Sequence, residues 1–224
     1  LLRTDCAWYK PWTCQAEPLV RLLGTLTQQD LFVPNLVGQV EGGADYLTIE
    51  AYRIEGLHVK LGVTTPLGTP RLQLQLSWLF GAYQFTHFSP AVDDATAAAL
   101  HIDGTERLGY FGEALVVDLR DDPIEPHRGA YAELRAAEGG SFAGGAFSYL
   151  QLTPDVRGYL PLGPVVLAAR ARIGLITGDV PPTERYYAGG ASSNRGFPER
   201  QLSPIATASG TSVVIGGAAL AETS

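Results

Sequence analysis

The chain has 224 residues, of which 46% are hydrophobic and 17% are charged, and its formal net charge is -7. This apolar content excludes a disordered chain, and the acidic balance with scattered basic residues argues against a nucleic-acid partner. No run approaches the roughly 18 apolar residues of a membrane-spanning helix. A membrane β-barrel remains open, because its lipid-facing residues alternate with polar ones and leave no such run.

The first segment of distinctive composition is CAWYKPWTC, which contains both cysteines of the chain, Cys6 and Cys14. An isolated close pair of cysteines indicates a disulfide formed in an oxidising compartment, with two reduced thiols as the alternative. No histidine lies nearby to complete a four-ligand metal site. We therefore expect no metal at this segment.

Alternation of apolar and polar residues with period two is the dominant pattern further along the chain, and it predicts β-strands. In RLQLQLSWLFGAY (71–83), Leu72, Leu74 and Leu76 alternate with arginine and glutamine. The other alternating segments are 56–63, 109–120, 129–137, 149–158 and 165–176, and the alternation is weakest in 109–120.

The lengths of these strands and of their connections favour a membrane barrel. Many of the runs have nine to twelve residues, which matches a tilted membrane-spanning strand and exceeds the usual length in soluble sheets. Short turns rich in proline and glycine follow every second strand, and the other connections are mostly longer, as in outer-membrane barrels. We count about eight strands. A soluble β-sandwich also explains the alternation, but it explains the strand lengths and the connections less well.

The polar face of the predicted strands carries charges of both signs. In a barrel these side chains compensate one another around lumenal water. They are Glu133, Arg135, Asp155, Arg157, Arg170 and Arg172.

No catalytic set is present in the sequence. The four histidines are dispersed, and none lies at metal-ligand spacing from another. The acid pairs Asp93–Asp94 and Asp121–Asp122 have the character of loop and turn residues. We expect a protein that is not an enzyme.

A longer motif near the end of the chain points to a family. The segment VPPTERYYAGGASSNRGF (180–197) is followed by RQLSP and later by VIGGAALAETS, and DDPIEPHRGAYAEL (121–134) lies upstream. This combination resembles the barrel domain of the bacterial surface antigens, the BamA/TamA family of outer-membrane assembly factors. The segments around Pro181-Pro182 and Ser203-Pro204 are closer to the TamA-like branch.

The resemblance implies an all-β fold, an antiparallel transmembrane β-barrel of sixteen strands preceded by POTRA domains. Residues 1–224 then form a partial C-terminal barrel domain, from the second outer loop to the twelfth strand. The POTRA domains and the closing strands are expected to lie outside this sequence, which has no methionine and no signal peptide. About half a barrel leaves two open sheet edges, so we expect that it does not fold alone.

The resemblance also implies which residues matter. The loop from Gly178 to Ser212 matches the outer loop that folds back into the lumen in this family. Arg195 matches the motif arginine, which forms an ion pair with lumenal carboxylates, and Glu222 is the candidate partner within this chain. Asn194 and Pro198 depart from the family pattern. The motif residues are Gly189, Gly190, Ser193, Arg195, Gly196 and Phe197.

The function implied by the resemblance is assembly and insertion of outer-membrane proteins, or translocation of polypeptides, in the bacterial outer membrane. A weakly closed seam between first and last strands exposes backbone donors and acceptors that template a substrate strand. Expected partners are the lipid bilayer, unfolded outer-membrane or secreted polypeptides, and periplasmic accessory proteins, with no cofactor. The alternatives are a two-partner-secretion transporter of the same superfamily and a passive porin or structural barrel.

Overall fold

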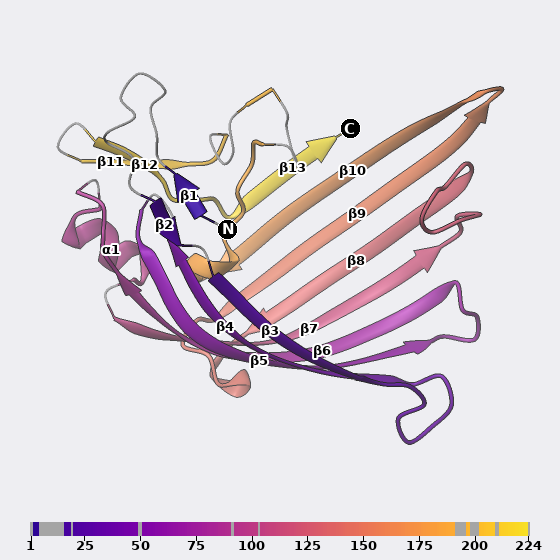
Figure 1. Cartoon of the computed structure of the whole chain (residues 1–224), viewed down its shortest axis with the longest axis horizontal. Helices are drawn as coiled ribbons and strands as arrows, with labels where there is room; N and C mark the ends of the chain where they lie inside the picture. The colour runs from indigo at the N-terminus through magenta and orange to yellow at the C-terminus, as the bar shows by residue number, and fades with distance from the viewer. Residues whose placement is uncertain are drawn as a thin grey trace.

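The computed structural model describes residues 2–4, 16–18, 20–48, 51–90, 92–102, 104–190, 196–197, 202–208 and 211–223. Its main element is an antiparallel sheet of nine strands in the order β13-β10-β9-β8-β7-β6-β5-β4-β3 (Figure 1). The strands are β3 (Val20–Gln28), β4 (Val37–Thr48), β5 (Arg53–Pro66), β6 (Leu72–Thr86), β7 (Thr105–Asp118), β8 (Gly129–Gly139), β9 (Tyr149–Leu162), β10 (Val165–Gly178) and β13 (Ala219–Thr223). The prediction of an all-β antiparallel fold is confirmed, with one strand more in this sheet than the eight expected.

Small elements flank the sheet. Strand β1 (Leu2–Thr4) pairs with β2 (Ala16–Pro18), and β11 (Ile205–Ala208) pairs with β12 (Thr211–Val214). The helical elements are α1 (Asp94–Leu100), η2 (Ser141–Ala143) and η3 (Pro182–Glu184). Within the described residues, no helix is long and apolar enough to cross a membrane.

The connections between consecutive strands of the sheet differ at its two ends. Figure 1 shows the turns 29–36, 67–71, 119–128 and 163–164 at one end, which we call the short-turn end. The segments 87–104, 140–148 and 179–218 connect strands at the opposite, long-loop end, together with the short connection 49–52. The predicted alternation of connections is confirmed, and in outer-membrane barrels the tight turns lie on the periplasmic side.

The outer face of the sheet is apolar and uncovered. Leu76, Leu150 and Leu152 are 42%, 47% and 42% exposed, so no second sheet or helix layer packs on them among the described residues. A continuous apolar face of this extent is suited to lipid rather than to water. Its exposed residues on β9 and β10 are Leu150, Leu152, Val156, Leu160, Leu162, Val165, Leu167, Ile173 and Leu175.

Glu113 is an acidic residue on this outer face. In the sheet register it lies between Leu76 of β6 and Ala136 of β8, and its side chain is exposed. It stands six residues after Arg107 of β7 and six before Leu119, which directly follows the end of β7. Each separation is roughly 20 Å at about 3.3 Å per residue. The carboxylate is therefore placed near the middle of the lipid-facing band of β7.

The inner face is polar and faces the lumen. Successive side chains of a strand point to opposite faces of the sheet, so the residues between the outward-facing ones form the inner face. Members from each strand between β4 and β10 are Gln39, Lys60, Gln75, Ala114, Glu133, Thr153 and Arg172. The predicted division into an apolar outer face and a charged inner face is confirmed.

A hydrophobic core covers the inner face of the sheet at the long-loop end. The loop residues Tyr52, Val92, Ile102 and Phe147 form one buried cluster with inner-face residues near the strand ends. Tyr52 and Phe85 meet edge to face, with ring centroids 5.2 Å apart. The inner-face strand residues of this buried cluster are Ile54, Tyr83, Phe85, Leu108, Tyr149 and Ile176. The lumen therefore has an apolar layer at the long-loop end and a polar layer toward the short turns.

Helix α1 belongs to this closing layer and was not expected within the loop 87–104. Asp93 caps its first turn by accepting a hydrogen bond from the Thr96 N–H at 2.8 Å. His101 ends the helix in a left-handed conformation with φ of 53°. The helix places Leu100 in the buried cluster, so Asp93 has a capping role.

The acid pair of the turn 119–128 also has the predicted structural role. Asp121 accepts hydrogen bonds from the N–H groups of His127 and Arg128 at 3.0 and 3.1 Å. Asp122 accepts from the Ile124 N–H at 2.7 Å. These backbone donors lower the pKa of both carboxyl groups. The pair stabilises the turn between β7 and β8.

Candidate functional site in the lumen

The polar layer of the lumen is organised around Asp155 on β9. Its side chain is only 7% exposed, and it accepts hydrogen bonds from two arginines. Arg157 of the same strand donates from Nε to Oδ1 and from Nη2 to Oδ2, both at 3.1 Å. Arg170 of β10 donates from Nε to Oδ2 at 3.1 Å and also from Nη2. One carboxylate thus joins two neighbouring strands through two forked guanidinium groups.

A second carboxylate continues this network on β8. Glu133 accepts a hydrogen bond from Arg135 Nε at 3.1 Å and another from the Tyr131 hydroxyl at 2.9 Å. The guanidinium carbon of Arg157 lies 5.0 Å from the centroid of the Tyr131 ring, a cation–π distance. The predicted mutual compensation of lumenal charges is confirmed on β8, β9 and β10.

A third group of charges lies across the sheet on β3, β4 and β5, and sequence reasoning missed it. Asp45, whose side chain is 3% exposed, accepts a hydrogen bond from Arg21 Nε at 2.6 Å. His58 Nδ1 lies 3.0 Å from the other oxygen of Asp45, and His58 Nε2 lies 3.7 Å from Glu41. Gly43 leaves room for the His58 ring, because a Cβ at that position would overlap it. The group ties three consecutive strands together on the inner face.

The connection after β10 enters the lumen. Pro181 is fully buried, and η3 follows it directly. Glu184 lines two lumenal cavities, of about 440 and 400 Å³, so this segment lies between them. The first cavity contains the Asp155 network, and the second contains Asp45 and His58.

Glu184 has an unusual environment for a carboxyl group. Burial raises its pKa to about 7, and the positive charge of Lys60 on β5 acts in the opposite direction. Tyr149 has a buried hydroxyl without a hydrogen-bond partner in the part of the chain that the structure describes. Glu184 lies outside the spanning strands, on the segment that enters the lumen, and its carboxyl group is titratable.

The following residues lead into the predicted motif loop. Gly189 and Gly190 have φ angles of 107° and 92°, which favour glycine over other residues. The Gly190 N–H donates to the Phe197 carbonyl at 3.0 Å. The structure thus brings the glycine pair and the Gly196–Phe197 end of the motif together as the base of one loop.

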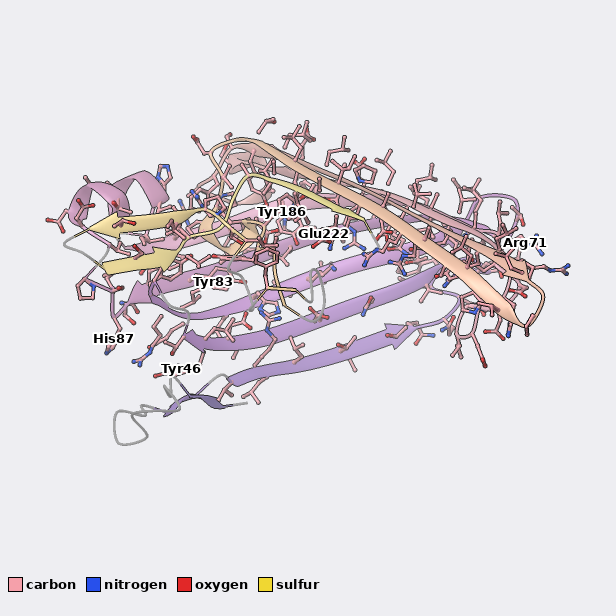
Figure 2. The ribbon with its side chains drawn as sticks, turned by 90° about the horizontal axis from the view of Figure 1, so that it is seen from above. Tyr46, Arg71, Tyr83, His87, Tyr186 and Glu222 are labelled. Carbon is pink, nitrogen blue, oxygen red and sulfur yellow. The ribbon has the colours of Figure 1, made fainter. Side chains whose placement is uncertain are left out.

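The outcome for the predicted site residues follows from this geometry. Glu222 of β13 pairs with Arg172 in the sheet register, and its carboxylate lies 4.0 Å from that guanidinium group. Figure 2 labels Glu222 and Tyr186, which both belong to the lumenal side. Ser193 and Arg195 lie outside the described residues, so their roles stay predictions. Cys6 and Cys14 also lie outside them, and their disulfide stays a prediction.

The described carboxylates and histidines are the side chains that a metal site would use. The described ranges contain no group of three or more His, Cys, Asp or Glu side chains arranged to hold a metal ion. The lumenal carboxylates described above have arginine, tyrosine or histidine neighbours. This site can bind through charge and hydrogen bonding on the lumenal surface.

A sheet with a lipid-suited outer face, a lumen of paired charges and a loop segment folded against that lumen defines a membrane β-barrel protein. This chain belongs to the Omp85 superfamily, since it matches the Omp85 superfamily domain over residues 3–224. It is also similar to the crystal structure of BamA from Haemophilus ducreyi lacking POTRA domains 1–3, with a TM-score of 0.75 at 15% sequence identity. The match covers 94% of this chain and 45% of that chain, so this chain spans less than half the length of the chain it matches. No curated protein matches the chain.

Two predictions from the sequence are thereby confirmed. The resemblance to the bacterial surface-antigen barrel is correct at the level of the superfamily, and the chain is located in the bacterial outer membrane. The assignment to the TamA-like branch stays a prediction, as do the boundaries from the second outer loop to the twelfth strand.

Proposed function

We propose that this chain is the barrel part of a factor that assembles and inserts outer-membrane proteins. Membership of the Omp85 superfamily supports this role at the family level. The specific mechanism we propose is strand templating, in which a substrate strand pairs with exposed backbone groups at the barrel seam. Folding of the substrate supplies the free energy, so the mechanism requires neither a nucleotide nor a catalytic residue.

The observation that carries the proposal is the packing of loop residues against the inner face of the sheet, where they would obstruct the lumen of a closed barrel. The segment 182–187 contributes to the lining of both lumenal cavities, and the cluster around Tyr52 and Ile102 packs at the long-loop end. A passive porin needs a continuous water-filled channel. An obstructed lumen favours a protein that acts through its wall and seam over a protein that conducts solutes.

The proposed partners follow from this role. They are the outer-membrane lipids, unfolded outer-membrane polypeptides and periplasmic accessory proteins. A two-partner-secretion transporter remains the second candidate, because an obstructing segment that moves aside leaves a path for a secreted chain. Two POTRA domains in the full-length protein favour secretion, and three or more favour assembly.

The test uses the full-length protein reconstituted in liposomes with an unfolded outer-membrane barrel as substrate. Folding of the substrate is followed by its shift in electrophoretic mobility without heating. We expect faster folding than in protein-free liposomes. Unchanged folding together with protease protection of a secreted polypeptide inside the liposomes identifies a transporter instead. Unchanged folding with steady ion conductance identifies a porin.

A further inference from the structure

The side chain of Tyr186 connects the lumenal segment to the barrel wall. Its hydroxyl lies 2.6 Å from Thr153 Oγ1 and accepts a hydrogen bond from Gln151 Nε2 at 3.1 Å. Both partners are inner-face residues of β9, two positions apart. The phenol group thus reaches a polar site in the same cavity as the Asp155 network.

The wall has a recess for the same ring. Gly174 lies on β10 between Arg172 and Ile176, on the inner face. A Cβ at this position would overlap the ring of Tyr186. Because Gly174 has an ordinary strand conformation, the close approach of the ring is the reason for a glycine here.

The backbone of Tyr186 makes a third attachment. Its N–H donates to the Gly217 carbonyl at 2.8 Å, and its carbonyl accepts from the Gly217 N–H at 2.9 Å. Gly217 precedes β13, so Tyr186 joins the outgoing and returning ends of the connection 179–218. Tyr186 therefore contacts β9, β10 and the approach to β13.

The motif loop begins directly after this anchor. The Ala188 N–H donates to Ser203 Oγ at 2.8 Å, and the Leu202 N–H donates to the Ala188 carbonyl at 3.0 Å. Gly190 and Phe197 form the next pair. The position of Tyr186 fixes where these paired residues lie on the inner side of the sheet.

We propose that Tyr186 is the positioning residue that holds the segment 180–190 against the barrel wall, with Gly174 as its recess. This inference rests on the proposed function in one respect, because the proposed function makes the loop part of the assembly machinery. When the ring leaves the recess, the segment loses both attachments to the wall and the two cavities are no longer kept apart.

The experiment measures ion conductance of the full-length protein in planar bilayers. Tyr186→Ala removes the ring and the hydroxyl, Tyr186→Phe removes only the hydroxyl, and Gly174→Ala fills the recess while Tyr186 stays. We expect Tyr186→Ala and Gly174→Ala to raise the frequency of open events about five- to tenfold, and Tyr186→Phe to raise it less, since a net hydrogen bond is worth a smaller factor.

Matched controls separate this effect from general loosening of the barrel. Tyr46→Phe removes the hydroxyl of a tyrosine that has the outer parity of β4, and Gly158→Ala adds a Cβ where nothing lies within 4 Å. Both controls should conduct like the wild type. The double variant Tyr186→Ala/Gly174→Ala should open no more often than Tyr186→Ala, because Gly174 acts only through the ring.

Wild-type conductance in folded Tyr186→Ala and Gly174→Ala proteins would overturn the proposal, as would additive effects in the double variant. Folding is checked by the mobility shift of each variant before the measurement. Conductance reports the anchor, and substrate folding in liposomes reports the assembly function. A wild-type protein that fails to accelerate folding therefore contradicts the proposed function and leaves the anchor to be decided by conductance.

Discussion

Replacement of Asp155 by asparagine tests the lumenal charge network most sharply. Asparagine keeps the shape of the side chain and removes its charge, which leaves Arg157 and Arg170 without their shared carboxylate. These two arginines are directly opposite each other in the register of β9 and β10, where like charges repel. The variant therefore loses two charge-assisted pairs and leaves the repulsion between the two arginines uncompensated.

The magnitude follows from the burial of the three groups. Removing one member of a fully buried pair costs about 3 to 5 kcal/mol. Asp155 is 7% exposed, but each arginine is 33% exposed, so water screens part of the loss. We expect the free energy of unfolding to fall by about 2 to 3 kcal/mol, measured by urea titration of the full-length barrel in detergent with the mobility shift as readout.

Two further measurements decide whether the cause is the unpaired charge. Raising the salt concentration to about 1 M shortens the electrostatic screening length from about 8 Å to about 3 Å. The loss of unfolding free energy in Asp155→Asn should therefore be smaller at high salt. In an Arg157→Gln/Arg170→Gln background, Asp155→Asn should leave the free energy of unfolding nearly unchanged. A single variant within about 0.5 kcal/mol of the wild type, or an equal loss in that background, would refute the reasoning.

Three other predictions concern single carboxylate and arginine positions. Glu113→Leu should raise the stability of the full-length barrel in bilayers by about 1 kcal/mol, because a charged group on the lipid face is unfavourable; a loss of stability in bilayer unfolding would reveal a partner for Glu113. The raised pKa of Glu184 favours the protonated carboxyl in the folded state, so its stabilising contribution is complete below the ordinary value near 4.5 and is lost as the pH rises through about 7. Glu184→Gln should flatten that part of the stability–pH profile, and an unchanged profile would contradict the assignment. Arg195→Ala should lower both barrel stability and assembly activity, and full retention of both would rule out its predicted lumenal ion pair.

The faces of the sheet were predictable from sequence because each strand of a barrel has the same two environments along most of its length. Leu72, Leu74 and Leu76 of β6 show this simply, as every second residue is apolar. The alternation is weaker on β7, because its inner-face residues Ala114 and Val116 are themselves apolar and buried. Both faces of this part of β7 are apolar, so the alternation of apolar and polar residues is weak there.

Register and loop placement were not predictable in the same way. The contact of Arg21 with Asp45, and of Asp45 with His58, depends on which residues of three strands lie opposite one another. That register is set by turn geometry and packing, which a single sequence does not display. Helix α1 was missed because its seven residues lie in a loop and carry no repeated apolar stripe.

The lumenal segment shows the same limit at the candidate site. The motif drew attention to Gly189, Gly190 and Arg195, but Glu184 and Tyr186 lie in an aperiodic stretch. Their roles depend on contacts with Lys60, Gln151 and Thr153, which are more than 30 residues away in the chain. The sequence did contain one signal of the Tyr186 contact, which is Gly174 within the alternating strand β10. A glycine inside a strand often marks the close approach of another group.

The central claim is that alternate residues of each strand face hydrocarbon and lumenal water. The most direct test is site-directed spin labelling of residues 149 to 158 on β9, one at a time, in the full-length protein in bilayers and in a background without native cysteines. Accessibility to oxygen should peak at Leu150, Leu152 and Val156, and accessibility to a polar nickel reagent should peak at Gln151 and Thr153. Low accessibility of Leu150, Leu152 and Val156 to both reagents would contradict the account, because it would place a second protein layer on the outer face.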